Sequence, residues 1–348
     1  MPGRSKAPQG VPRRVHPNNR ALVRMLRRGG RCAKACGGYS LPVKTIIMPR
    51  YVGTRFTHAV LQVLASDHGI DLLHIKGPAV DDRLLAVGPP GDPPSSTPRP
   101  IPRQSVDADV LVRPAHVARL FEVMHRHGWV TAYDFADGSA FEHAATFTHP
   151  FLSPADVHRQ FPGIEADAST AFERLWRERR TALVAGIPCL VPSLTAQRLL
   201  LIVHAARGGA LQHSDILRSW TEATEEARDE VQHLARALGA EVALAAGTGR
   251  LDEYEGRRGY ELWRALSTGE RSRVRLWLAR VKSEPTTSTK LRRAVRLVLP
   301  NRRRMHTVLG RRPTLAEVAG AYATRARAGL NEMARLVRSG RTEPGQRR

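Results

Sequence analysis

Cysteine is scarce in this chain of 348 residues, which contains only Cys32, Cys36 and Cys189. Three cysteines are too few for a disulfide framework, and their scarcity is typical of proteins in a reducing compartment. Cys32 and Cys36 are four residues apart, but no second Cys or His pair at zinc-finger spacing follows them. The pattern therefore favours an incidental pair over a structural zinc site.

Long apolar runs are also lacking. The longest candidate, residues 196–206, contains Arg198 and His204, so no segment is predicted to cross a bilayer. The N-terminus is basic from the start, and neither an apolar h-region nor a small-residue cleavage site follows it. We therefore expect a soluble, cytoplasmic protein without a membrane partner.

Acidic residues are absent from one end of the chain and rare at the other. Residues 1–55 contain 13 Lys or Arg and no acid, and residues 271–348 contain 21 Lys or Arg and four acids. The segment between them contains 21 basic and 28 acidic residues, so the formal charge of +23 belongs to the ends. Basic ends can bind nucleic acid by counterion release. However, 49 of the 55 basic residues are Arg, which the base composition of the coding sequence explains equally well.

Composition and periodicity divide the chain into four segments. We expect a basic, largely disordered or weakly helical arm at residues 1–55 and a disordered tail at residues 341–348. Residues 56–192 are predicted to form an α+β core, interrupted by a Pro/Gly-rich insertion at residues 86–104. Residues 193–340 are rich in Ala, Leu and Arg at helical spacing, so they are predicted to form a mainly helical C-terminal domain.

The core contains an Asp-x-Asp pattern on a predicted strand. Asp107 and Asp109 alternate with apolar residues, so both carboxylates share one face, roughly 7 Å apart along the strand. Such a pair can hold two divalent ions about 3.5 to 4 Å apart. Asp156 begins a later predicted strand that follows another at residues 144–148. Lys76 and Gly77 follow a predicted helix at residues 56–67 and a short predicted strand at residues 70–75. The glycine permits a turn whose backbone can approach a phosphate closely.

Each of these residues also has a structural interpretation. An isolated Asp-x-Asp is common on solvated strands, Asp156 can cap a turn, and Lys76 can be a surface residue at a strand end. His158 is a candidate for a supporting role beside a metal, whereas His143 and His149 are more often structural. His204 is typical of a core histidine. Three helix caps are also predicted. Thr195 is a candidate cap of the helix at residues 195–206, and either Asp215 or Ser214 is a candidate cap of the helix at residues 215–238. Thr314 and Glu317 are predicted to form a capping box at the start of the last helix.

Together, these residues resemble the uncharacterised nucleotidyltransferase family of the DNA polymerase β-like superfamily. The resemblance rests on three segments, residues 70–77, residues 103–112 and the triplet Asp156-Val157-His158. It implies a nucleotidyltransferase core, a small mixed sheet flanked by helices, followed by the helical domain. It further implies Mg²⁺ or Mn²⁺ bound by Asp107, Asp109 and Asp156. Two departures from the family pattern are the long segment between Gly77 and Asp107 and a Gly-Pro pair in place of Gly-Ser.

The resemblance also assigns a nucleotide site and a reaction. Lys76 and Gly77 would contact the triphosphate of an NTP, with Arg103 and Ser105 beside it. The enzyme would transfer a nucleoside monophosphate to a hydroxyl on a small molecule, protein or RNA. The alternative is a catalytically inactive protein of the same fold that binds nucleic acid or an acidic partner through its basic ends. A toxin-like enzyme acting on tRNA would combine the two.

Overall fold

The computed structural model describes most of the chain between residues 49 and 341. The described residues are 49–90, 98–101, 103, 105–135, 143–209, 213–270, 272–298, 305, 309 and 311–341. The predictions for residues 1–48, for Cys32 and Cys36, for the middle of the insertion and for residues 342–348 lie outside this part.

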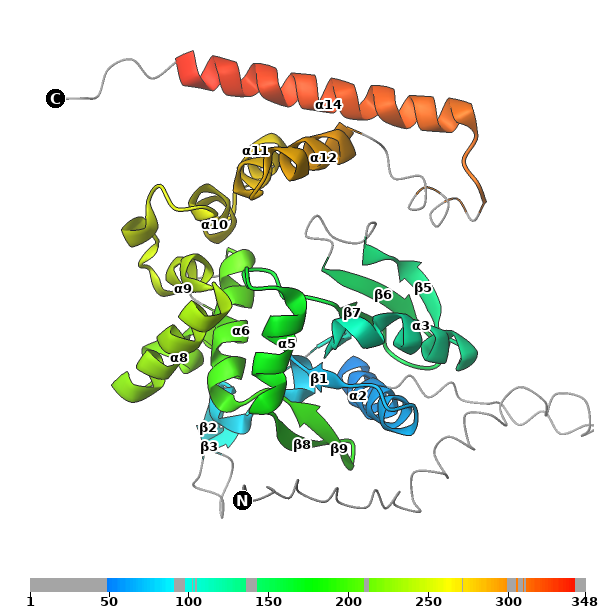
Figure 1. Ribbon diagram of the computed structural model, residues 1–348, viewed down its shortest axis with the longest axis vertical. Coiled ribbons are helices and arrows are strands. Elements are labelled where there is room, and N and C mark those ends of the chain that lie inside the picture. The colour runs from blue at the N-terminus through cyan, green and yellow to red at the C-terminus, as the bar shows by residue number, and fades with distance from the viewer. Residues whose placement is uncertain are drawn as a thin grey trace, which may run out of the picture. The chain divides into compact units, whose positions relative to one another are not determined.

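A five-stranded mixed sheet forms the centre of the described fold (Figure 1). Its order is β1(Leu72–His74), β4(Ala108–Val112), β7(Ala155–His158), β6(Ala144–Thr148), β5(Val130–Tyr133). The β4–β7 pair is parallel, and the other three pairs are antiparallel. Because side chains alternate along a strand, residues paired across strands point to the same face. The register therefore decides which side chains of β4 and β7 meet.

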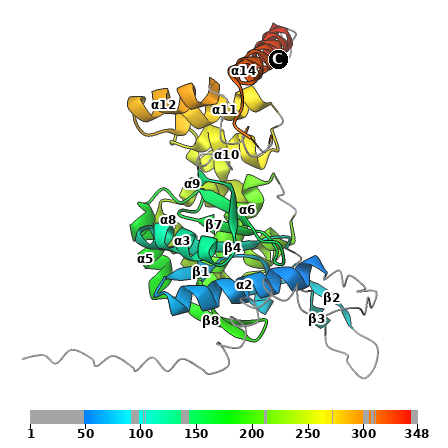
Figure 2. The ribbon, with the colours of Figure 1, turned by 90° about the vertical axis from the view of Figure 1, so that its right-hand side faces the viewer.

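Helices cover both faces of the sheet. One face carries His74 and packs against α2(Arg50–Asp67), which runs alongside β1 and β4 (Figure 2). The connection from β4 to β6 includes α3(Val117–Arg126). The opposite face carries Leu73 and Leu111, which are register partners and belong to a hydrophobic cluster with α5(Ala168–Arg177) and α6(Leu194–Arg207). The sheet is thus the middle layer of a mixed α+β fold.

The second half of the described chain is helical. The cluster that contains α6 also includes residues of the next three long helices, so α6 joins them to the sheet. Ser272 Oγ donates a 2.6 Å hydrogen bond to Glu332 of the last helix. The remaining helices are α7(Ser214–Ile216), α8(Glu225–Leu238), α9(Glu241–Thr248), α10(Tyr260–Ser267), α11(Arg273–Ser283), α12(Thr287–Val298) and α14(Leu315–Arg341).

Several local predictions are confirmed. The strand at residues 144–148 has the predicted bounds, and the helix predicted from residue 56 begins at Arg50 and ends at Asp67. The capping box before α14 is present: Glu317 N–H donates to Thr314 Oγ1, and Thr314 N–H donates to the Glu317 carboxylate. None of the described helices combines the length and apolar character needed to span a bilayer.

Other local predictions are wrong. Ser193, not Thr195, caps α6 by accepting from Ala196 N–H, while Thr195 Oγ1 donates to Glu230. The helix predicted at residues 215–238 is broken by a π-helical turn at Leu217–Thr221, and Thr224 caps a new helix. The insertion contains the strand pair β2(Val87–Pro90) and β3(Pro98–Pro100). The sequence predictions also missed β5, α5 and the hairpin β8(Arg180–Val184)–β9(Ile187–Val191).

Candidate active site

The parallel pairing of β4 and β7 brings two carboxylates together. Asp109 and Asp156 are register partners, so both side chains leave the sheet on the face that α5 and α6 cover. His158, two residues after Asp156, points the same way and pairs with Leu111. Asp107 lies just before β4, in the segment that leads into this strand. The structure therefore gathers all three predicted carboxylates at one end of β4 and β7.

Asp109 is a buried carboxylate with two close partners. Its Oδ1 lies 2.7 Å from Lys76 Nζ and 2.7 Å from His158 Nε2, and its side chain is only 5% exposed. Burial alone would raise the pKa of Asp109. The Lys76 ammonium and the His158 imidazole outweigh that effect and hold the pKa well below its ordinary value. Asp109 is therefore ionised at neutral pH.

Asp107 and Asp156 contact hydroxyl groups, whereas Asp109 contacts a lysine and a histidine. Thr146 Oγ1 donates a 2.7 Å hydrogen bond to Asp156 Oδ1, and Ser105 Oγ lies 3.1 Å from Asp107 Oδ1. Burial, followed by repulsion from Asp109 and Asp156, raises the pKa of Asp107 above its ordinary value. A cation among these groups would relieve that repulsion.

The donor set suits a divalent ion. Asp109, Asp156 and His158 each offer one ligand atom, and these atoms all lie within 4.8 Å of one another. Carboxylate oxygens are the usual ligands of Mg²⁺ and Mn²⁺, and imidazole nitrogen suits transition metals. Asp107 is outside this group of three, although its charge interacts with those of Asp109 and Asp156. The residues present therefore fit a metal ion of the kind expected.

The turn after β1 is shaped around Gly77. Gly77 has φ +63°, a left-handed conformation, and a side chain there would lie 3.2 Å from Ser105 Cβ and 3.5 Å from His58 Nε2. The left-handed conformation disfavours a side chain here, and a Cβ would also require Ser105 to move by a few tenths of an ångström. Lys76, immediately before this turn, reaches back to Asp109. Lys76, Gly77 and Ser105, predicted together, therefore adjoin the carboxylates.

The first turns of α2 hold the loops that precede both carboxylate strands. Thr54 Oγ1 donates to the Ser105 carbonyl at 3.0 Å, and Thr57 Oγ1 donates to the Ser153 carbonyl at 3.1 Å. These are long-range contacts between a helix and the entries to β4 and β7. Thr54 and Thr57, neither of which was predicted as functional, fix where the strands start.

A buried hydrogen-bond chain continues along α2. Leu190 N–H of β9 donates to Gln62 Oε1 at 3.0 Å, and His74 Nε2 lies 3.2 Å from the same oxygen. His74 Nδ1 is 2.7 Å from His58 Nδ1. Burial lowers the pKa of His58 to about 4 and that of His74 well below its ordinary value, so both rings are neutral at pH 7. His58 Nε2 has no hydrogen-bond partner among the described residues.

Helix α6 contributes Arg207, which the sequence predictions missed, and His204, which was predicted to be a core histidine. Arg207 Nη1 lies 3.2 Å from His143 Nε2, and its Nη2 lies 3.4 Å from His204 Nδ1. Burial lowers the pKa of Arg207, whereas the charges of Asp109 and Asp156 oppose that effect. Burial also lowers the pKa of His143 to about 2 and that of His204 to about 3. A usable signal was present, because His204 and Arg207 interrupt an apolar helix at a spacing of three.

Arg103 lies near His204 and forms an ion pair with Asp215. Asp215 is buried in the first turn of α7. The cap of that turn is His213, which accepts from Asp215 N–H, so Asp215 is not the cap. Arg103 also contributes to the electrostatic environment of His204. Its predicted contact with a triphosphate stays a prediction.

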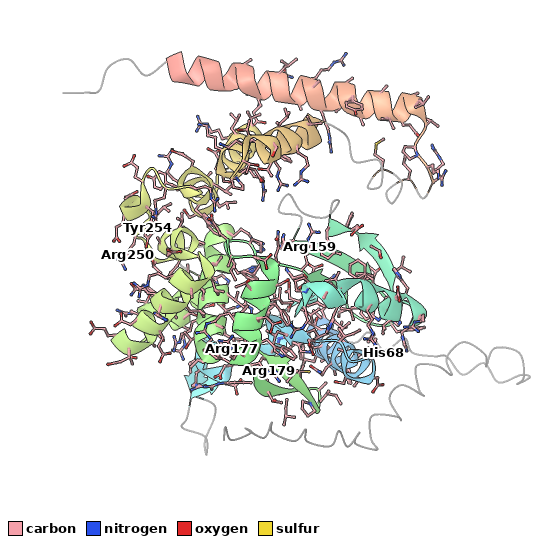
Figure 3. All side chains as sticks on the ribbon, in the orientation of Figure 1. His68, Arg159, Arg177, Arg179, Arg250 and Tyr254 are labelled. Atoms are coloured by element: carbon pink, nitrogen blue, oxygen red, sulfur yellow. The ribbon has the colours of Figure 1, made fainter. Side chains whose placement is uncertain are left out.

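A separate pocket lies away from the carboxylates. It is lined by residues of α8, α9 and the turns beside them, including Trp220, Arg236, Arg250 and Tyr254. Figure 3 shows Arg250 and Tyr254 near α9, whereas Arg159, which follows β7, lies on the other side of α6. None of the predicted site residues lines this pocket.

Comparison with known proteins gives one match. The model of a family described as uncharacterised nucleotidyltransferase matches residues 55–254, more than half of the chain. Neither the curated proteins nor the solved structures include a match to this chain. The matched range contains the turn at Gly77, all three carboxylates and α6 with Arg207. On this match, the chain belongs to the uncharacterised nucleotidyltransferase family.

Proposed function

We propose that this protein transfers a nucleoside monophosphate from an NTP to a hydroxyl of an acceptor and releases pyrophosphate. One observation carries the proposal: Asp109 and Asp156 are register partners on parallel strands, with Lys76 paired to Asp109. Two carboxylates on one face beside a lysine provide both the ligands for a divalent ion and a positive charge for a phosphate.

The carboxylates have distinct roles in this proposal. Asp109 and Asp156 would hold a divalent ion, with Asp107 as a further ligand. Such an ion lowers the pKa of a bound hydroxyl and neutralises charge on the phosphoryl group. Asp156 would also act near the acceptor hydroxyl, and Thr146 donates a hydrogen bond to its carboxylate.

The positive groups would bind the triphosphate. The Gly77 turn lets backbone approach the phosphates closely, and Lys76 adds an ammonium group beside it. Ser105 adjoins this turn, and Arg103 forms an ion pair with Asp215. Arg207 is an additional candidate, since its guanidinium interacts with both Asp109 and Asp156. A guanidinium so placed can neutralise charge that develops on a transferring phosphoryl group.

The test is metal-dependent binding of each nucleotide. Calorimetry with ATP, GTP, CTP and UTP, with and without Mg²⁺ or Mn²⁺ at fixed salt, would compare the wild type with Asp109→Asn and Asp156→Asn. Asp71→Asn is the matched control, because Asp71 pairs with Arg113 away from this site. We expect metal-dependent binding in the wild type and the control only. Folded wild type that binds no NTP would overturn the proposal.

A second candidate function has one specific observation in its favour. Residues 272–298, which contain α11 and α12, have eight Lys or Arg and one acid. A protein that uses this fold only to bind nucleic acid would depend on such charges and not on the carboxylates. Three results together would favour this second function: the protein binds no NTP, it binds RNA with an affinity that decreases steeply with salt, and Asp109→Asn leaves that affinity unchanged.

A further inference from the structure

One of the three residues that could hold a metal ion, His158, is an imidazole rather than a carboxylate. His158 is two residues after Asp156 on β7, and its side chain is only 2% exposed. Its Nε2 lies 2.7 Å from Asp109 Oδ1. The histidine is thus not at the rim of the site but beside the most buried of the three predicted carboxylates.

The spacing of these atoms resembles the edge of a coordination shell. In an octahedral shell with bonds of about 2.1 Å, neighbouring ligand atoms are about 3 Å apart and opposite ones about 4.2 Å. Asp109 Oδ1 and His158 Nε2 are 2.7 Å apart, and the whole group of three lies within 4.8 Å. The two atoms therefore need to move apart by only a few tenths of an ångström to bind the same ion.

The two ring nitrogens of His158 have different surroundings. As the donor to the Asp109 carboxylate, Nε2 carries a hydrogen in this structure. Nδ1 is buried and has no hydrogen-bond partner among the described residues. Ligation by Nε2 displaces its proton, as metal binding commonly does, and breaks no hydrogen bond of Nδ1 among the described residues.

We infer that His158 is a direct metal ligand and that the site consequently prefers a first-row transition-metal ion, such as Mn²⁺, to Mg²⁺. This inference rests on the proposed function for the presence of a metal. Mg²⁺ favours oxygen ligands and keeps its waters, whereas imidazole suits the transition metals. A purely carboxylate site would offer both ions the same kind of ligand.

The other role available to His158 is to hold Asp109 in place by its N–H. The two roles separate in the variant His158→Gln, since a glutamine amide retains an N–H for Asp109 and has no nitrogen lone pair for a metal. His127→Asn is the matched control, because His127 contacts the Val123 carbonyl in the last turn of α3, away from the carboxylates.

The experiment combines pulsed EPR with calorimetry on the full chain. Protein containing ¹⁵N-histidine is loaded with Mn²⁺, and coupling to a directly bound nitrogen is measured in the wild type, His158→Gln and His127→Asn. We expect the coupling in the wild type and the control, and its loss in His158→Gln. Calorimetry should show that His158→Gln weakens Mn²⁺ binding by about 10- to 100-fold but Mg²⁺ binding by less than about threefold.

The opposite results are equally clear. Wild-type protein that binds Mn²⁺ without a coordinated histidine nitrogen overturns the inference, whether or not His158→Gln folds. Equal weakening of Mn²⁺ and Mg²⁺ binding in a folded His158→Gln also overturns it, because a positioning role affects both metals alike. If NTP still binds with Mg²⁺ in either case, the proposed function stands and only the inference fails. If neither metal supports NTP binding, the proposed function fails, and the nitrogen coupling alone then decides the inference.

Discussion

Replacing Lys76 by Met should expose how strongly the fold depends on the charge pair with Asp109. The two side chains are 10% and 5% exposed, and their charged atoms are 2.7 Å apart. Methionine keeps much of the side-chain volume but removes the positive charge. Asp109 then keeps His158 as its partner and loses its nearest permanent cation.

The expected cost follows from that burial. Breaking a buried ion pair by removing one partner destabilises a protein by about 3 to 5 kcal/mol, because the remaining charge is left uncompensated. For a structured region of this size, each kcal/mol lowers the melting temperature by about 2 to 4 °C, so we expect a decrease on the order of 10 °C. The double variant Lys76→Met/Asp109→Asn removes both charges and should be more stable than Lys76→Met alone.

Thermal unfolding with and without Mn²⁺ measures this dependence. A divalent ion supplies the charge that Lys76→Met lacks, so added Mn²⁺ should raise the melting temperature of the variant more than that of the wild type. The reasoning is refuted if Lys76→Met loses less than about 1 kcal/mol and the double variant is no more stable than the single one.

Three other predictions concern the Gly77 turn, the cap of α6 and the pH dependence of stability. Gly77→Ala should destabilise the fold and abolish NTP binding, whereas Gly69→Ala, with a similar φ and no atom within 4 Å, should cost only the backbone strain of about 1 kcal/mol, as thermal unfolding and calorimetry would show. Ser193→Ala should cost about 1 kcal/mol by denaturant unfolding and Thr195→Ala less than half of that; equal costs would contradict the assigned cap. Because the pKa of Asp107 is raised in the fold, its contribution to stability is lost as pH rises from 3.8 through the raised pKa, so metal-free wild type should lose stability relative to Asp107→Asn over this range. Unfolding curves that keep the two proteins parallel across this range would contradict that cause.

The sequence predicted the elements whose side chains alternate or repeat regularly. Asp107 and Asp109 stand in a clear strand pattern, and the apolar residues after Phe56 have helical spacing, so β4 and α2 were predictable. The pairing of Asp109 with Asp156 was not, because local periodicity contains no information on which strands become parallel neighbours. Proximity of the two carboxylates was expected only through the family resemblance.

The missed hairpin shows a different limit. β8 and β9 are joined through Ala185 and Gly186, with φ values of 49° and 76°, the left-handed pair that a tight hairpin turn requires. The usual sequence signal for such a turn is Asn-Gly or Asp-Gly, and alanine rarely adopts that conformation. The π-helical break at Leu217–Thr221 was equally hidden, since the helical spacing continues across it. Thr224 followed by two glutamates was a signal for the new helix, but the longer pattern obscured it.

The buried chain from β9 to α2 makes the missed hairpin relevant to the Gly77 turn. Leu190 N–H can only donate, so Gln62 Oε1 must accept, His74 Nε2 must donate and His74 Nδ1 must accept. His58 Nδ1 then donates, which leaves the lone pair on His58 Nε2, 3.5 Å from the position that a side chain on Gly77 would take. A backbone amide in a two-stranded hairpin thus determines the hydrogen-bonding polarity of an imidazole beside the proposed phosphate turn, although the two are separated by more than a hundred residues in sequence.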